Sequence, residues 1–167
     1  MAKEEVILVN DSDEQIGTME KMEAHEKGLL HRAFSVFIFN DKGEMLLQQR
    51  AMDKYHSAGL WTNTCCSHPR PGEDTLQAAH RRLFEEMGIK APLTFKTSFT
   101  YKTAFENGLT EHEFDHVFTG IYNDEPKINL HEAHSFCWKS VEGTKNSVKT
   151  MPDIYTSWFK IAIEKAF

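Results

Sequence analysis

The sequence has few cysteines, no long apolar run and no excess of positive charge. Its three cysteines, two of them adjacent, are too few for a disulfide framework, so we expect reduced thiols and a cytoplasmic protein. The longest apolar stretch, residues 33–39, falls far short of the roughly 20 residues of a membrane span, so no membrane association is expected. Lysine and arginine number 19 against 25 acidic residues, which argues against nucleic acid as the main partner because phosphate contacts supply most of that affinity.

What remains is an ordinary globular composition, with 40% hydrophobic and 26% charged residues in a chain of 167. No repeat and no linker rich in proline, glycine or serine divides the chain, so we expect one domain over residues 1–167. Residues 1–14 have neither a basic start nor a long apolar run, and no secretory signal is expected there. Nine histidines are many for this length.

Several segments have the pattern of β-strands. Two runs rich in β-branched, aromatic and aliphatic residues, 33–39 and 44–49, flank the turn sequence Asn40–Gly43, which indicates a hairpin. Further strands are expected at residues 60–65, 94–105, 111–122 and 134–138.

Two helices are expected among these strands. Within residues 75–87 apolar side chains recur every three or four positions, with Asp74 as a cap and Gly88 as a stop. A C-terminal helix is expected over residues 151–166, with Thr150 as its cap. Strands interleaved with helices predict an α/β fold, a sandwich around a mixed sheet.

A group of histidines and glutamates has the composition of a metal site. Glu111 and Glu113 are two residues apart on an expected strand, so their side chains point to the same face. With His25, His31 and His68 they supply three imidazoles and two carboxylates, which suit Mn²⁺, Zn²⁺ or Mg²⁺. The alternative is that all five are solvated surface residues. The other histidines show no such pattern and are expected to be structural: His56, His80, His112, His116, His131 and His134.

The helix at residues 75–87 resembles the Nudix box, G-x5-E-x7-R-E-U-x-E-E-x-G-U, in which U is aliphatic. Positions that fit are Glu73, Arg81, Leu83, Glu85, Glu86, Gly88 and Ile89. Ser67 stands where the first glycine belongs, and Arg82 replaces the first glutamate. The resemblance implies a metal and a diphosphate, whereas Arg82 argues against hydrolysis and offers a guanidinium for phosphate oxygens.

The chain as a whole, from about Lys21 to Trp158, resembles the type I isopentenyl-diphosphate Δ-isomerases, a Nudix-fold family. The resemblance rests on the segment Trp61–Pro69 (WTNTCCSHP), on Tyr101, on Glu111-His112-Glu113 and on Trp158. It implies a Nudix-like α/β/α sandwich around a mixed β-sheet. It also implies metal-dependent interconversion of isopentenyl and dimethylallyl diphosphate in isoprenoid biosynthesis, through a tertiary carbocation.

The resemblance also implies a role for particular residues. Cys66 and Glu113 would move protons on opposite faces of the substrate, assisted by Tyr101, and Trp158 would stabilise the cation. The metal shell would be His25, His31, His68, Glu111 and Glu113, and Glu86 would bind a second ion, Mg²⁺, that arrives with the diphosphate. The diphosphate would be bound by Lys21, Arg50, Lys54 and Arg82.

Two other functions stay open on the sequence. One is a Nudix hydrolase that cleaves a nucleoside diphosphate derivative, and the other is a diphosphate-binding module without catalysis. For the isomerase we expect a small-molecule diphosphate as the partner, no nucleic acid, and a monomer or weak dimer.

Overall fold

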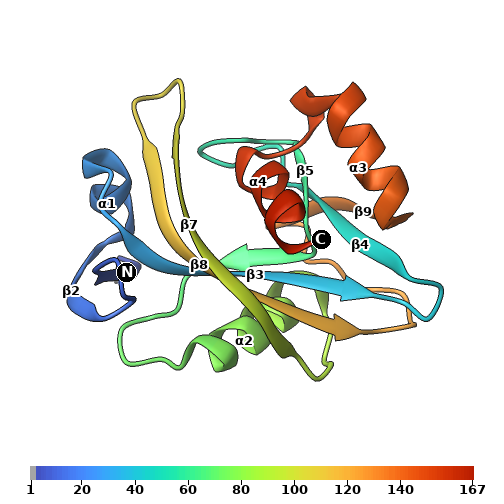
Figure 1. Ribbon diagram of the computed structural model, residues 1–167, viewed down its shortest axis with the longest axis horizontal. Helices are drawn as coiled ribbons and strands as arrows, with labels where there is room; N and C mark the ends of the chain where they lie inside the picture. Colours follow the sequence, from blue (N-terminus) through green and yellow to red (C-terminus); the bar gives the residue numbers. More distant parts are fainter. Residues whose placement is uncertain (1–2) are drawn as a thin grey trace.

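A computed structural model describes residues 3–167, in which nine strands form one sheet and four α-helices surround it (Figure 1). Met1 and Ala2, the start of the segment without an expected secretory signal, lie outside the described residues. The strands are β1 (Glu5–Val9), β2 (Gln15–Glu20), β3 (His31–Phe39), β4 (Glu44–Arg50), β5 (Trp61–Thr62), β6 (Cys65–Ser67), β7 (Thr94–Ala104), β8 (Thr110–Ile121) and β9 (Ala133–Ser140). The helices are α1 (Lys21–Lys27), α2 (Thr75–Met87), α3 (Val141–Thr150) and α4 (Ser157–Ala166).

Strand β3 organises the sheet. It pairs in parallel with β8 over its whole length and antiparallel with β1, β4 and β6. Strand β7 continues the sheet beyond β8, and β9 continues it beyond β4, both antiparallel. The sheet is therefore mixed, and the predicted α/β fold is confirmed. Within residues 3–167 the structure contains no helix long and apolar enough to cross a membrane.

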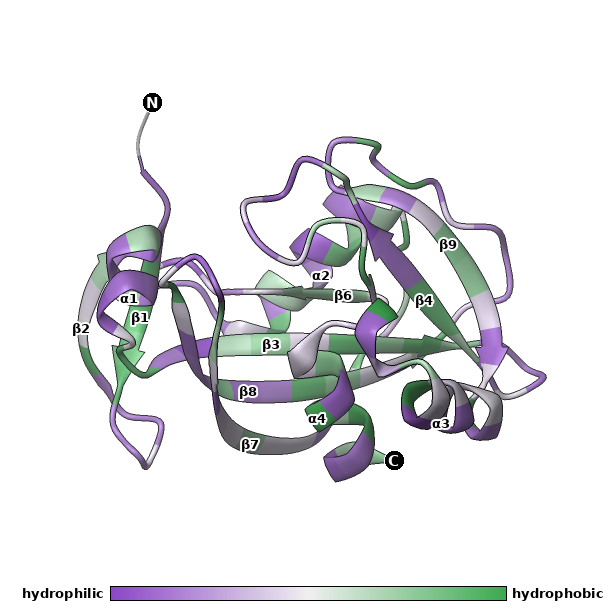
Figure 2. Ribbon diagram, turned by 90° about the horizontal axis from the view of Figure 1, so that it is seen from above, coloured by the Kyte–Doolittle hydropathy of each residue, from purple (hydrophilic) through white to green (hydrophobic). Residues whose placement is uncertain are grey.

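Helices cover both faces of the sheet, with α2 on one side and α4 on the other (Figure 1). Alternate side chains of β3 point to these two layers, as strand geometry requires. Phe34 and Val36 are buried in one core with Leu83 of α2, whereas Phe37 is buried in a second core with Phe159 of α4. Burial on both faces explains why β3 is hydrophobic along most of its length (Figure 2).

Helix α2 has the predicted bounds and the predicted ends. The Asp74 carboxylate accepts a hydrogen bond from the Gln77 backbone N–H at 3.2 Å, which caps the first turn. Gly88 takes a left-handed conformation with φ of +65°, and a Cβ atom there would lie 2.7 Å from the Lys127 carbonyl oxygen. Only glycine combines that φ with so close an approach.

The predicted strand at residues 60–65 is wrong in its extent. The segment forms two short strands, β5 beside β4 and β6 beside β3, because the chain crosses from one partner to the other. Polar side chains stabilise the segment where the chain crosses. Asn63 donates to the backbone oxygens of Val36 and Cys65, and Thr64 donates to that of Leu46. The pairing places Cys66 in β6 rather than just beyond a strand.

The predicted helix from Met151 is also wrong in its start. Helix α3, which the sequence patterns did not predict, ends at Thr150, and a short 3₁₀ turn, Pro152–Ile154, follows. Helix α4 then begins at Ser157, where the Thr156 hydroxyl accepts from the Phe159 N–H at 3.3 Å. Pro152 starts the 3₁₀ turn and not the long helix, and the end at Ala166 agrees with the prediction.

The N-terminal segment, for which no element was predicted, forms β1, β2 and α1. Helix α1 is short, and the Glu20 side chain caps it by accepting from the backbone N–H groups of Met22 and Glu23. It lies beside β8 at the end of the sheet where β1 meets β3. This placement carries Lys21 and His25 to the same end of the sheet as the start of β3.

Candidate active site

A cleft of about 790 Å³ lies between the start of α1, the loop after β4, helix α2 and helix α4. Most side chains that line it are charged or otherwise polar. The residues from the sequence prediction that line it are Lys21, Arg50, Lys54, Cys66, His68, Arg82, Glu86, Tyr101, Glu111, Glu113 and Trp158. Positions distributed over most of the chain therefore meet in one place.

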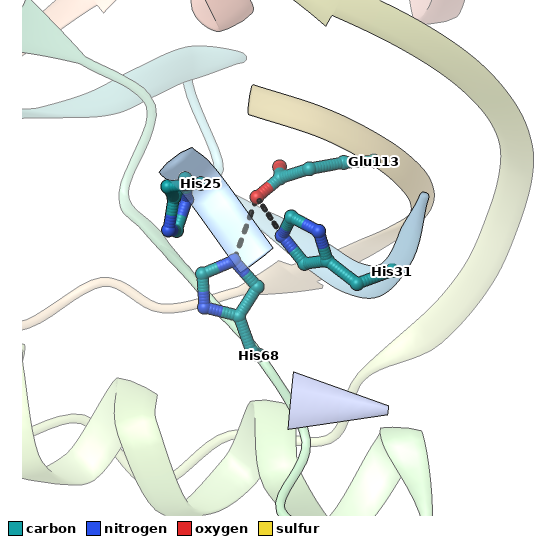
Figure 3. A group of neighbouring side chains, drawn as sticks. All are labelled: His25, His31, His68 and Glu113. Atoms are coloured by element: carbon teal, nitrogen blue, oxygen red, sulfur yellow. Dashed lines mark hydrogen bonds and ion pairs between the residues drawn. The ribbon is translucent and has the colours of Figure 1, made fainter. Parts of the chain in front are cut away.

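At one end of the cleft, His25, His31, His68 and Glu113 form a compact cluster (Figure 3). Each offers a ligand atom, and these four atoms lie within 4.8 Å of one another. The Glu113 carboxylate oxygen Oε2 lies 3.1 Å from His31 Nε2 and 2.6 Å from His68 Nε2. The parallel register of β3 and β8 sets His31 directly beside Glu113, which explains why residues 82 positions apart meet.

The histidine rings are oriented by backbone carbonyls. The Nδ1–H of His25 donates to the Lys21 oxygen at 2.7 Å, and the Nδ1–H of His31 donates to the Leu29 oxygen at 2.9 Å. In both rings this turns Nε2 toward the cluster, where it can either carry a proton toward a carboxylate or bind a metal ion. His25 Nε2 is buried and has no hydrogen-bond partner within the described residues. A buried acceptor of this kind is the position that a metal ligand occupies.

Glu111 lies beside this cluster, with its Oε2 3.7 Å from His25 Nε2. Donor atoms bound at about 2.1 Å to one ion lie roughly 3.0–3.4 Å apart. The observed separations between imidazole nitrogens and carboxylate oxygens, from 2.6 to 3.7 Å, bracket that range. Three imidazoles and the Glu113 carboxylate are thus close enough to hold a divalent cation, with Glu111 beside them, and the shell of five donors stays a prediction.

Charges within the cluster shift the pKa values of its members. Burial by itself raises the pKa of Glu113, but the neighbouring His68 and the hydrogen bond from His31 outweigh it and hold that pKa well below its usual range. Burial lowers the pKa of His68. For His31, the hydrogen bond to Glu113 outweighs burial and leaves the pKa raised. The carboxylate is therefore ionised at neutral pH.

Tyr101 connects the two carboxylates. Its position opposite Glu113 in the β7–β8 pairing brings its hydroxyl within hydrogen-bond distance of Glu113 Oε1 and 2.8 Å from Glu111 Oε1. Burial and the two carboxylates raise the pKa of Tyr101 well above its ordinary value. The phenol thus remains protonated and acts as a hydrogen-bond donor.

Cys65 and Cys66 point to opposite sides of β6, as predicted from their adjacency. Cys65 is fully buried in the core beneath α2, whereas Cys66 faces the cleft. The Trp158 indole Nε1–H donates to Cys66 Sγ at 3.0 Å. Burial, together with the charge of Glu86, raises the pKa of Cys66, so the sulfur holds its proton at neutral pH.

The cleft is also lined by cations that already have partners. Lys21 pairs with Glu4 at 2.7 Å, and Lys54 pairs with Glu132. The Arg50 guanidinium lies over the Trp158 ring, 5.1 Å from its centroid. These side chains are held near the cleft by groups that a stronger anion would displace.

Arg82 and Glu86 lie one turn apart on the face of α2 that lines the cleft. They pair at 2.9 Å, and Arg82 also lies 3.4 Å from Glu132. Burial raises the pKa of Glu86, opposed by the charge of Arg82. Arg81 binds Glu73, just before the helix, and Glu85 at 2.8 and 2.9 Å; Glu85 also lies 3.2 Å from Arg82, and neither glutamate lines the cleft.

His56 belongs to this site although the sequence patterns assigned it a structural role. Its Nε2 lies 3.3 Å from Glu111 Oε2, and its side chain lines the cleft. The loop that carries it turns sharply, with φ of +55° at Ser57 and +73° at Gly59. Gly59 is the one local signal for this turn; the partner of His56 lies 55 positions away, so spacing alone gives no sign of it.

Comparison with known proteins agrees with this arrangement. A NUDIX domain model matches residues 29–157. An isopentenyl-diphosphate Delta-isomerase from Pectobacterium atrosepticum is 51% identical over 161 residues, which cover 96% of this chain and 90% of that protein. One from Serratia proteamaculans is 51% identical over 156 residues, covering 93% and 87%. A crystal structure of a Deinococcus radiodurans protein superimposes with a TM-score of 0.82 over 98% of this chain and 99% of that one, at 18% identity, which shows a shared fold.

The fold and the domain match together define a Nudix-type α/β protein with a histidine–carboxylate cluster. Within that class, the chain belongs to the isopentenyl-diphosphate Δ-isomerase family.

Proposed function

We propose that this chain interconverts isopentenyl diphosphate and dimethylallyl diphosphate, with Cys66 and Glu113 as its proton-transferring pair. One observation carries the proposal. A protonated thiol and an ionised carboxylate line the same cleft, between a metal-ligand cluster and a group of cations. A hydrolase needs no such pair, because its chemistry takes place at phosphorus.

The reaction adds a proton to one carbon and removes a proton two carbons away, which moves the double bond. An unactivated alkene is a weak base, and its protonation gives a tertiary carbocation. The site must therefore supply an acid, a base on the other face, and a stabilising group in a dry pocket. Cys66 and Glu113 act as the acid and the base, and they exchange these two roles when the reaction runs in the opposite direction. Tyr101 keeps the Glu113 carboxylate in position by hydrogen bonding to Oε1.

Trp158 is proposed as the group that stabilises the cation. An indole face attracts a cation by about 2 kcal/mol or more when the pair is desolvated. Trp158 is only 5% exposed, and its N–H contacts the Cys66 sulfur, so the ring is held beside the reacting hydrocarbon. Arg50 lies over the same ring in the ligand-free arrangement, which supports an indole that already accepts a cation.

The metal centre is proposed to be His25, His31, His68, Glu111 and Glu113, with Mn²⁺, Zn²⁺ or Mg²⁺ as the ion. The buried His25 Nε2 without a partner and the spacing of the donors support it. A divalent ion bound there would withdraw charge from Glu113 and so adjust how readily that group exchanges a proton.

The diphosphate is proposed to bind to four cations that line the cleft, Lys21, Arg50, Lys54 and Arg82. Phosphate oxygens would accept charge-assisted hydrogen bonds from these side chains, in place of the carboxylates that Lys21, Lys54 and Arg82 bind. Glu86 would then be released by Arg82 to bind the Mg²⁺ that accompanies the diphosphate. The phosphates remain intact and anchor the substrate.

The cell context follows from fewer observations. The three cysteines are free, which supports a reducing, cytoplasmic environment. The net charge of −6 supports a small-molecule substrate rather than nucleic acid, and a monomer or weak dimer suffices because this chain supplies every residue of the proposed site.

The decisive experiment uses purified protein, isopentenyl diphosphate and Mg²⁺. The expected product is an acid-labile allylic diphosphate, with no release of phosphate. Mg²⁺-dependent phosphate release would instead support the hydrolase, and tight binding without turnover that is unchanged in Cys66→Ser would support a binding module.

A further inference from the structure

The ring of His56 is enclosed by aromatic side chains. It stacks on Phe105 with centroids 4.4 Å apart and an interplanar angle of 11°, and it meets Trp158 edge to face at 5.6 Å. Only 7% of the residue is exposed. A side chain held on two sides in this way has little rotational freedom, so the direction of its nitrogens is fixed by packing.

The neighbours of the ring favour one tautomer. Nδ1 lies 3.2 Å from the Ser57 hydroxyl, which can either donate or accept. Nε2 points toward Glu111 Oε2 at 3.3 Å, and because a carboxylate only accepts, the ring proton is assigned to Nε2. Nε2 is buried and makes no hydrogen bond of good geometry within residues 3–167. Glu111 is therefore the acceptor that this donor approaches.

Each carboxylate of the cluster is approached by two imidazoles. Glu113 Oε2 lies near His31 and His68. Glu111 Oε2 lies near His25 at 3.7 Å and His56 at 3.3 Å. The proposed metal shell uses the first three rings and leaves His56 without a function.

We infer that His56 is a positioning residue, whose Nε2–H attracts the Glu111 carboxylate across 3.3 Å and so orients it toward the metal. This inference rests on the metal centre of the proposed function. The Tyr101 hydroxyl lies 2.8 Å from Oε1 of the same carboxylate and shares its one proton between this oxygen and Glu113, so the N–H of His56 is a second group that restricts the rotation of Glu111. Loss of an outer donor of this kind typically weakens metal binding by about 10–100-fold. The contact of His56 with Trp158 joins this arrangement to the indole beside Cys66.

Two substitutions at His56 distinguish the effect of its N–H donor from the effect of its aromatic ring. His56→Phe keeps an aromatic ring between Phe105 and Trp158 but removes the N–H. His56→Gln loses the ring but places an amide N–H at about the reach of Nε2. His134→Gln, at an exposed position on β9, is the matched control. Affinity for Zn²⁺ alone is measured on metal-stripped protein by competition with a fluorescent chelator, and each variant is checked for folding by circular dichroism.

We expect His56→Phe to bind Zn²⁺ about 10–100-fold more weakly than the wild type, and His56→Gln to stay within about threefold. Wild-type affinity in His56→Phe, or equal losses in both variants, would overturn the role of the donor. His56→Leu replaces His56→Phe if the latter does not fold. Wild-type protein that binds Zn²⁺ no better than His68→Ala would instead overturn the metal centre itself, and the inference with it.

Discussion

The indole N–H of Trp158 donates to the sulfur of Cys66 at 3.0 Å, which joins the last helix to one of the shortest strands of the sheet. The sulfur accepts this bond while its own proton lies toward the Asn63 side-chain oxygen at 3.5 Å. The thiol is thus fixed in place by one group from a distant helix and one from three residues earlier in the chain. Cys65, its neighbour in sequence, lies on the opposite side of the strand in the core.

This relationship predicts unequal effects of removing the two thiols. Cys66→Ala removes one end of the proton relay, and general acid–base catalysis contributes typically about 10²–10⁴-fold, so isomerisation should fall by at least that factor. Cys65→Ala should retain most activity, because that thiol packs against α2. Steady-state turnover of isopentenyl diphosphate measures both. Equal impairment of the two variants would contradict the assignment.

Glu113→Gln should also abolish isomerisation while the fold survives. The amide keeps the size of the side chain but cannot take up a proton, and it is a weaker ligand than a carboxylate. The same turnover assay measures the loss, and circular dichroism checks the fold. Activity within tenfold of the wild type would exclude Glu113 as the proton-transferring carboxylate.

The metal centre predicts that a chelator abolishes activity and lowers thermal stability. An ion that binds the folded state alone at 100 times its dissociation constant stabilises it by about 2.7 kcal/mol. His68→Ala should lower metal occupancy, as measured by elemental analysis, and should reduce the rise in unfolding temperature on metal addition. Full activity in metal-free protein without added Mg²⁺ would contradict the five-donor site.

The sequence predicted the elements that rest on strong local patterns. Helix α2 has a clear apolar stripe and good caps, and β3 has a continuous apolar run because both its faces are buried. Helix α3 is capped by the Ser140 hydroxyl, but it contains Gly143 and several β-branched residues, which favour a helix weakly. Packing stabilises it, since Thr144 and Ser147 are buried and Tyr155 donates to the Ser147 hydroxyl at 2.7 Å.

Site residues that belong to a local sequence pattern could be predicted. Those whose role depends on contacts between distant segments could not. The spacing of Glu111 and Glu113 on one strand predicted that they face the same way, and the structure adds that Tyr101 lies against both. His56 was missed because its role depends on a contact with Glu111 that no local pattern encodes. The pairing of Lys54 with Glu132 is of the same kind, since β9 must first lie against β4.

A pH dependence of stability is expected from His116, outside the cleft. Burial lowers the pKa of His116 below its ordinary value of 6.5, although Asp13 at 2.9 Å opposes this and Arg32 adds to it. The unfolded chain therefore binds more protons than the folded one as pH falls below about 6.5, and stability is lost in that range. In metal-saturated protein, urea unfolding of His116→Gln should lose less stability than the wild type between pH 7 and 5. A steeper loss of stability in the variant than in the wild type would contradict the lowered pKa of His116.

Arg82 distinguishes an isomerase from a hydrolase, and its neighbour Arg81 provides the control. Both arginines pair with glutamates of α2, but Arg82 alone of the two lines the cleft. A guanidinium donates to diphosphate oxygens and cannot bind a cation, so it serves as an anchor that contributes equally to ground and transition states. Arg82→Ala should therefore raise KM about tenfold or more and lower kcat less.

Arg81→Ala should lower stability, because it removes the ion pairs of Arg81 with Glu73 and Glu85, and leave KM unchanged. Wild-type protein and both variants should release no phosphate from isopentenyl diphosphate or from nucleoside diphosphate derivatives. The reason is geometric: Glu73 and Glu85, which a hydrolytic helix would offer to metal, are paired with arginines and do not line the cleft, and Glu86 stands there beside Arg82. Efficient Mg²⁺-dependent phosphate release by the wild type would show that this helix still performs hydrolysis.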